Sequence, residues 1–348
     1  MGLFRFKKGR CLIGLDIGSS AVKAVEFTDH GDRLAVTAYN QKPLESKEAA
    51  ADIVRECIID GNFHTRDVAT SVSGRGVVVR FVNMMKMSQE ELEKAVQFEA
   101  DKYIPFELSD VVLASQKLEE IKDPTMSERE MKVLLVAVKK ETIEEHIDIL
   151  RKAGLNPQII DVDAFALSNA FEMKELLGPK MAASDKVDAL VDIGSNKTNI
   201  SIVKNMALRF SREFYIAGND FTDAVAKRLQ MDLQEAEAVK ANPAGREQEV
   251  EEAVRQLIED FANEIHLSSD YYESKYEEEV DEIYLSGGGA KLYGLAQSLE
   301  QIFGKRVSLW DPFEGYDVDT SNVNTDALAR NAPRLVIAAG LAARIRGG

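Results

Sequence analysis

Cysteine and histidine are scarce in this chain of 348 residues, which has two cysteines, Cys11 and Cys57, and four histidines. Two cysteines cannot build the disulfide framework of small secreted proteins, and scattered histidines do not form a Cys/His zinc site. Positive charge is also in short supply, because 43 Lys and Arg face 59 Asp and Glu, for a net charge of -16. Nucleic-acid phosphates attract Lys and Arg, so this composition excludes DNA and RNA as expected partners.

Long hydrophobic runs are missing as well. The apolar run at residues 335–339 is far shorter than the about 20 residues that a transmembrane helix needs. The opening residues are basic, but only five uncharged residues separate Arg10 from Asp16, too few for the apolar part of a signal peptide. We therefore expect a soluble protein of a reducing compartment, with about two domains.

Strand-like and helix-like segments alternate along most of the chain, which is typical of an α/β protein. In the first half, strands are predicted at residues 12–17, 21–27 and 34–38 and a helix at 49–59. The pattern from residue 77 to residue 162 predicts a βαββαβ unit, whose first helix begins with a capping box of Ser88 and Glu91. In the second half, the pattern predicts strands at 187–193, 199–203 and 282–285 and helices between 221 and 279. A linker is predicted at 177–185, just before the second half.

The two halves begin with the same motif. Asp-Ile-Gly-Ser occurs at residues 16–19 and again at residues 192–195, each time between an apolar strand and a second strand. Two copies this far apart indicate a duplicated fold with halves that face each other, rather than an array of repeats.

Both copies are suited to phosphate. Glycine lets a turn approach an anion closely, and successive N–H groups form an anion-binding concavity. Asp16 and Asp192 would repel a phosphate directly, so we expect a hydrated Mg²⁺ between them and the anion. Lys23 supplies positive charge. The alternative is a pair of ordinary strand-ending turns, in which Asp, Gly and Ser are common.

Rival motifs are absent from the sequence. There is no Gly-x4-Gly-Lys-Ser/Thr loop, no dinucleotide fingerprint, no Gly-x-Ser-x-Gly elbow and no His-Glu-x-x-His. Gly287, Gly288 and Gly289 follow the last predicted strand, where their backbone could lie flat against an adenine.

Asp16-x-Gly-Ser-x-x-x-Lys23, Asp192-x-Gly-x-x-x-Thr198 and Ser286-Gly-Gly-Gly289 resemble, in this order, the phosphate-1, phosphate-2 and adenosine motifs of the actin-like ATPase superfamily. The resemblance implies a duplicated α/β fold with two facing halves around a cleft for ATP and Mg²⁺. The implied first half comprises residues 1–83, 159–184 and 331–348, with an inserted βαββαβ subdomain at 84–158. The implied second half comprises residues 185–220 and 280–330, with a helical subdomain at 221–279.

The resemblance also implies a role for each matching residue. Asp16 and Asp192 would hold Mg²⁺ through water, and Asp163 would position the attacking water as a catalytic residue. The phosphates would contact Gly18, Ser19, Ser20, Lys23, Gly194, Ser195, Asn196 and Thr198. The nucleoside would contact Gly218, Glu237, Lys240, Gly287, Gly288 and Gly289. Asn196 departs from the superfamily, which has a second glycine at that position.

Residues 71–106 are similar to the PilM family of type IV pilus proteins, above all Glu-Ala-x-x-Tyr-Ile-Pro-Phe at 99–106. This similarity implies an ATP-binding cytoplasmic adaptor with at most slow ATPase activity, held at the inner membrane by partner proteins. It would bind the cytoplasmic N-terminal tail of PilN and so connect PilN, PilO and PilP to the pilus motor ATPases, as a homo-oligomer or ring. Two alternatives are a self-assembling filament like the cell-division protein FtsA, which shares the insertion, and an actin-fold sugar kinase.

Overall fold

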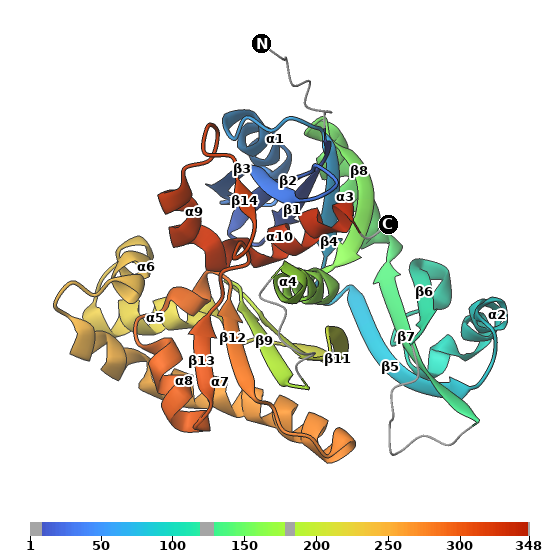
Figure 1. Cartoon of the computed structure of the whole chain (residues 1–348). Helices are drawn as coiled ribbons and strands as arrows, with labels where there is room; N and C mark the ends of the chain where they lie inside the picture. The colour runs from blue at the N-terminus through green and yellow to red at the C-terminus, as the bar shows by residue number, and fades with distance from the viewer. Residues whose placement is uncertain (1–8, 119–128, 178–184, 347–348) are drawn as a thin grey trace, which may run out of the picture.

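The computed structural model describes residues 9–118, 129–177 and 185–346. They form two α/β halves and a smaller inserted sheet (Figure 1). Helices α4 (Asp163–Leu177) and α10 (Val336–Ala342) cross between the halves. Most of the predicted linker at 177–185 lies outside the described residues.

The sheet of the first half has six strands in the order β14-β3-β2-β1-β4-β8. Strands β1, β2 and β3 are antiparallel neighbours, and β4 runs parallel to β1. Their apolar residues are buried on both faces, as expected for a sheet covered by helices. The three predicted strands and helix α1 (Ala50–Asp60) are confirmed, whereas β4 was not predicted. The strands are β1 (Arg10–Ile17), β2 (Ala21–Asp29), β3 (Leu34–Pro43), β4 (Asp67–Val72), β8 (Asn156–Val162) and β14 (Asp317–Val318).

The second half repeats this arrangement with the order β11-β10-β9-β12-β13. Strands β9, β10 and β11 are again antiparallel, and β12 runs parallel to β9. The predicted duplication is therefore confirmed by matching strand order and direction. The strands are β9 (Val187–Ile193), β10 (Thr198–Lys204), β11 (Ala207–Phe214), β12 (Glu282–Ser286) and β13 (Arg306–Leu309).

Helix α10 lies unusually close to its neighbours. A Cβ atom on Gly340 would lie 1.8 Å from the carbonyl oxygen of Ala166 in α4. On the other side, a Cβ on Gly14 of β1 would lie 1.9 Å from the carbonyl oxygen of Ala338. Both positions therefore require glycine, because a Cβ atom would overlap the backbone of the neighbouring element.

The inserted sheet has the order β5-β7-β6 and carries one helix, α2 (Gln89–Glu99), on one face. Leu92 and Val96 of α2 pack on Val133 and Leu135 of the sheet. The predicted capping box is confirmed, since the Ser88 hydroxyl accepts a hydrogen bond from the backbone of residue 91, whose carboxylate accepts one from the backbone of Ser88. The strands are β5 (Val77–Met85), β6 (Val111–Lys117) and β7 (Glu130–Lys139).

The inserted unit is smaller than the expected βαββαβ unit, and this is a correction. Helix α3 (Lys140–Lys152) and strand β8 belong to the first half. Strand β8 pairs in parallel with β4, and Leu150 of α3 is fully buried beside Val54 and Cys57 of α1. The segment pattern predicted both elements but could not show which sheet they join, because strand pairing depends on residues far away in the sequence.

Three helices, α5 (Gly218–Leu229), α6 (Leu233–Ala241) and α7 (Glu247–Tyr276), cover the second half and form the expected helical region. Two short helices, α8 (Leu295–Phe303) and α9 (Thr325–Asn331), complete the fold. Within the described residues, none of the helices has both the length and the hydropathy to span a bilayer.

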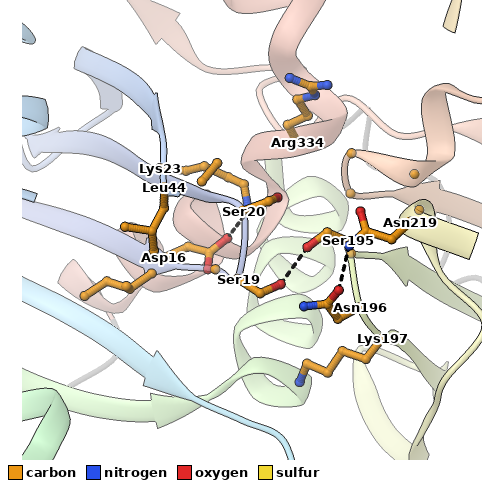
Figure 2. Close-up of a pocket in the computed structure, with 18 of the residues that line it drawn as sticks. Asp16, Ser19, Ser20, Lys23, Leu44, Ser195, Asn196, Lys197, Asn219 and Arg334 are labelled. Atoms are coloured by element: carbon orange, nitrogen blue, oxygen red, sulfur yellow. Dashed lines mark hydrogen bonds and ion pairs between the residues drawn. The ribbon is translucent and has the colours of Figure 1, made fainter. Parts of the chain in front are cut away.

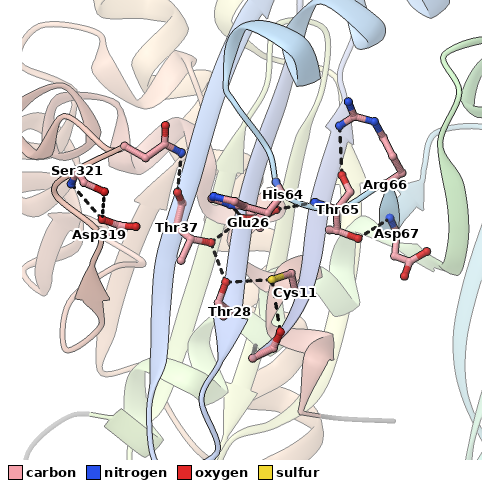
Figure 3. A network of polar contacts seen from close by, with 12 residues as sticks. Cys11, Glu26, Thr28, Thr37, His64, Thr65, Arg66, Asp67, Asp319 and Ser321 are labelled. Carbon is pink, nitrogen blue, oxygen red and sulfur yellow. Dashed lines mark hydrogen bonds and ion pairs between the residues drawn. The ribbon is translucent and has the colours of Figure 1, made fainter. Parts of the chain in front are cut away.

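A buried carboxylate connects the first-half sheet to the loop after α1 (Figure 3). Glu26 of β2 is fully buried and accepts hydrogen bonds from Thr37 at 2.6 Å and from the backbone of His64 at 2.8 Å. The His64 ring lies 2.7 Å from the same carboxylate. These partners replace the water that Glu26 loses on burial, so the network has a structural role in positioning β4.

Candidate nucleotide cleft

A cleft of about 1590 Å³ lies between the two halves. Both Asp-Ile-Gly-Ser turns, which follow β1 and β9, line it. The hydroxyls of Ser19 and Ser195 lie 2.6 Å apart and point toward each other across the cleft (Figure 2). The duplicated turns therefore meet at one place, which two unrelated strand-ending turns would have no reason to do.

The first turn carries a partly buried ion pair. The backbone N–H of Gly18 donates to the carbonyl of Ala21 at 3.0 Å, which closes the turn. Lys23 lies opposite Asp16 in the hairpin, with its ammonium 2.7 Å from the carboxylate. Burial lowers the pKa of Lys23, but Asp16 and the more distant Asp192 and Asp163 outweigh it and raise the pKa above the usual value. Lys23 is therefore a permanent positive charge among three carboxylates.

The second turn has the same geometry but different charges. The backbone N–H of Gly194 donates to the carbonyl of Lys197 at 2.9 Å. Asp192 accepts a hydrogen bond from the Ser286 hydroxyl at 2.8 Å. Burial raises the pKa of Asp192 to about 6, although Lys23 acts in the opposite direction. Asp192 therefore lies in a site that favours a further positive charge.

The predicted nucleoside residues on the helical side are held together by hydrogen bonds. Lys240 is 2% exposed and donates to the carbonyl of Gly218 at 3.0 Å and to Thr222 at 2.8 Å. It also forms an ion pair with Glu237. Burial lowers the pKa of Lys240, against the effect of Glu237. Helices α5 and α6 are thereby fixed to each other at the edge of the cleft.

The glycine loop after β12 lies directly on the second turn. Gly287 has φ of +85°, and a Cβ there would lie 2.3 Å from the carbonyl oxygen of Ile193. Gly288 is more open, since the first atom that its Cβ would meet is Nε of Arg334 at 3.8 Å. The loop thus presents flat backbone next to a guanidinium, a surface on which an aromatic ring can stack.

Of the predicted residues, Thr198 lies outside the cleft, whereas Asp163 lines it. Asp163, the first residue of α4, lines the cleft and accepts a hydrogen bond from Ser71 at 2.7 Å. Thr198 does not line the cleft: it is fully buried, and its hydroxyl donates to the carbonyl of Ile216 at 2.8 Å. The structure does not support the expectation that Thr198 contacts phosphate, because its buried hydroxyl is already bonded to the carbonyl of Ile216. The other predicted residues line the cleft: Asp16, Gly18, Ser19, Ser20, Lys23, Asp163, Asp192, Gly194, Ser195, Asn196, Gly218, Glu237, Lys240, Gly287, Gly288 and Gly289.

Several residues of the cleft were not predicted. Lys197 lies between Asn196 and Thr198 in the second turn and reaches Asp163. Asn219 donates to Asn196 at 2.7 Å from the start of α5. Arg334 lines the adenosine side. A lysine within a turn already assigned to phosphate was a usable sequence signal, whereas Arg334 comes from a distant segment and carried none.

The chemistry of these groups fits a nucleotide with Mg²⁺. Within the described residues, the Nε atom of Arg334 is buried without a hydrogen-bond partner, next to the open Gly288. Asp16 and Asp192 lie in the same cleft with hydroxyls and turn backbone, the oxygen-rich surroundings that a hydrated Mg²⁺ accepts. Lys23 offers a fixed positive charge to an anion.

Comparison with known proteins agrees with this geometry. A family model described as type IV pilus assembly protein PilM matches residues 14–346. The structure resembles the solved PilM-PilN type IV pilus biogenesis complex with a TM-score of 0.82 and 28% identity, covering 96% of this chain and 98% of that one.

Two further proteins are similar to this chain, one in sequence and one in fold. The cell division protein FtsA of Pseudomonas aeruginosa is 24% identical over 88% of this chain and 84% of its own length. MreB5 of Spiroplasma citri bound to AMPPNP has a TM-score of 0.52 at 12% identity, covering 96% of this chain and 95% of that one. The expected duplicated actin-like α/β fold is confirmed, and the chain belongs to the family of type IV pilus assembly protein PilM.

Proposed function

We propose that this protein is a nucleotide-binding adaptor of type IV pilus assembly, which binds ATP with Mg²⁺ in the cleft and the cytoplasmic tail of PilN on its surface. The observation that carries the nucleotide part is the meeting of the duplicated turns at Ser19 and Ser195. Anions bind where backbone N–H groups and hydroxyls converge near a cation, and Lys23 is such a cation. Resemblance to MreB5, solved with AMPPNP, supports the same reading.

Each part of the cleft would have one task. The two turns and Lys23 would hold the phosphates, and Asp16 and Asp192 would hold Mg²⁺ through its waters. The glycine loop and Arg334 would enclose the base, beside the Lys240–Glu237 pair. When bound, Mg²⁺ neutralises phosphate charge. Asp163 is hydrogen-bonded by Ser71 and would orient a water, and we expect turnover well below the about 10 s⁻¹ of a typical enzyme.

The nucleotide part is tested by calorimetry with ATP and Mg²⁺ on the full chain. Asp16→Ala and Asp192→Ala should each weaken binding of the magnesium complex, and Gly288→Leu should block the base. Asp101→Asn serves as the control, since it removes the carboxylate of an exposed residue just after α2, in the insertion. Unchanged ATP affinity in the three cleft variants would remove the nucleotide function.

The partner part follows from the family and from the PilM-PilN complex that the structure resembles. The inserted sheet contains no metal-binding cluster among its described residues, so recognition is a better role for it than catalysis. An extended peptide can lie along a sheet edge or in a groove between the insertion and the first half. Such a contact would place the protein in the cytoplasm at the inner membrane. Through PilN it would connect to PilO, PilP and the motor ATPases.

A synthetic PilN tail peptide should therefore bind the full chain. Replacing residues 78–137 by a Gly-Ser-Gly linker should abolish binding, since Val77 and Val138, which then flank the linker, are paired neighbours. Circular dichroism must show that the shortened protein stays folded. Full affinity in a folded deletion would place the peptide elsewhere.

A self-assembling filament is the second candidate, because FtsA is a relative over most of the chain. Sedimentation with and without ATP separates the two functions. A nucleotide-dependent pellet would favour a filament, and a discrete ring or monomer would favour the adaptor.

A further inference from the structure

Lys197 occupies an unusual position in the second turn. Its ammonium lies 2.6 Å from Glu213 and 3.4 Å from Asp163, and its side chain lines the cleft (Figure 2). Burial lowers the pKa of Lys197, but the two carboxylates outweigh burial and raise it. A charged ammonium on a flexible four-carbon stem is thus shared between two acids at the phosphate end of the cleft.

Glu213 connects this cation to another part of the molecule. The carboxylate oxygen that binds Lys197 also accepts a hydrogen bond from the backbone N–H of Gly74 at 3.1 Å. Gly74 lies in the short connection from β4 to β5, through which the chain enters the inserted sheet. One carboxylate therefore joins a cation of the cleft to the base of the insertion.

A second contact supports the same connection. The guanidinium of Arg75 lies 5.5 Å from the centre of the Tyr215 ring, two residues beyond Glu213. Strand β11, which carries Glu213, also contacts β5 directly. The insertion is thus held to the second half near the point where Glu213 binds Lys197.

A terminal phosphate would compete for Lys197. It presents several charged oxygens, whereas each carboxylate holds the ammonium only in part. We propose that Lys197 binds the terminal phosphate of ATP and thereby loosens the Glu213–Gly74 contact, so that the inserted sheet responds to whether ATP or ADP is bound. This inference rests on the proposed nucleotide binding. Glu213 is 27% exposed, so without Lys197 its carboxylate can turn toward water and release Gly74.

A purely structural ion pair predicts something different. If Lys197 only stabilised β10 and β11, its loss would affect ATP and ADP binding equally and would leave Gly74 insensitive to nucleotide. The discriminating measurement is therefore the ratio of the two affinities, together with the exposure of the connection between β4 and β5.

The first experiment measures binding of AMPPNP–Mg²⁺ and ADP–Mg²⁺ to the full chain by calorimetry. Lys197→Met should lower affinity for AMPPNP about tenfold or more and change affinity for ADP less than threefold. The matched control is Lys204→Met, since Lys204 of β10 also pairs with two carboxylates, Asp185 and Glu278, and does not line the cleft. It should leave the AMPPNP-to-ADP affinity ratio unchanged.

The second experiment measures hydrogen–deuterium exchange of the peptide spanning residues 72–80. In the unchanged protein, exchange should be faster with AMPPNP than with ADP, because Gly74 loses its acceptor. Glu213→Ala should abolish that difference while keeping the preference for AMPPNP. Exchange at residues 187–193, in the buried strand β9, reports whether each variant stays folded.

The outcomes separate this inference from the proposed function. No nucleotide binding by the unchanged protein would overturn both. Normal binding with an unaltered AMPPNP-to-ADP ratio in Lys197→Met would overturn the inference alone. Exchange that is equal or slower with AMPPNP would also overturn it.

Discussion

The two halves share one topology but distribute charge differently. Corresponding residues are separated by 176 positions, as for Ser19 and Ser195. The residue paired with Asp16 is Lys23, whereas the residue paired with Asp192 is Asn199. The first turn is thus electrically balanced, and the second keeps an unbalanced carboxylate whose pKa burial raises to about 6. The two turns therefore share one backbone geometry but offer a bound nucleotide different charges.

The largest effect should come from removing the charge that balances the first turn. Lys23→Met leaves the partly buried Asp16 without its partner, next to Asp192 and Asp163. We expect loss of ATP–Mg²⁺ affinity by about a hundredfold and destabilisation by about 2 kcal/mol, between the values typical of exposed and of buried ion pairs. Calorimetry and thermal melting measure the two effects.

Asn199→Ala is the matching change in the second half and should weaken ATP–Mg²⁺ binding less than threefold. Equal losses at Lys23 and Asn199 would show that the two sides of the cleft are not different in the way proposed.

A second contrast lies at the opposite end of the central strands, where Leu12 of β1 corresponds to Asp188 of β9. Burial, with Glu282 and Glu175 nearby, raises the pKa of Asp188 to about 7. The folded state therefore binds this proton more tightly than the unfolded state does, and stability falls as pH rises from about 4 through 7.

Asp188→Asn removes that titration. Between pH 5 and pH 8 the unchanged protein should lose about 2 kcal/mol more stability than the variant, measured by melting at each pH. Asp101→Asn is the exposed control. If the stability of Asp188→Asn and of the unchanged protein changed equally with pH across this range, the buried carboxyl would not be protonated as proposed.

The smallest effect should come from Thr198, whose counterpart in the first half is Val22. Thr198→Val restores that identity and removes one buried hydrogen bond to Ile216, at a cost of about 1 kcal/mol. ATP–Mg²⁺ affinity should stay within twofold, because Thr198 does not line the cleft. A tenfold loss of affinity without loss of stability would restore Thr198 to the phosphate site.

Local repetition explains why the cleft was predictable from sequence. Asp16, Ser19, Asp192 and Ser195 occur in two copies of one turn, and a turn is specified by neighbouring residues. The partners of α3 and β8 were not predictable, since a parallel strand is joined to its neighbour by contacts remote in sequence. Thr198 was misplaced because adjacent residues of a strand face opposite sides of the sheet, and here Asn199 lines the cleft whereas Thr198 does not.

The proposed role of Lys197 could not be predicted from the sequence for another reason. That role depends on contacts with Glu213 and Gly74, which the fold brings together from β11 and the connection after β4. Similarity to a superfamily motif directs attention to positions that the motif contains, and Lys197 is not one of them.

The glycine at the crossing of α4 and α10 has a mechanical consequence. At Gly340 and Ala166 the backbones of the two helices touch with no side chain between them, because a Cβ on Gly340 would lie 1.8 Å from the carbonyl oxygen of Ala166. A side chain at position 340 would have to push the two helices apart, and α4 begins with Asp163, which lines the cleft. The glycine is thus a spacer on which the position of Asp163 in the cleft depends.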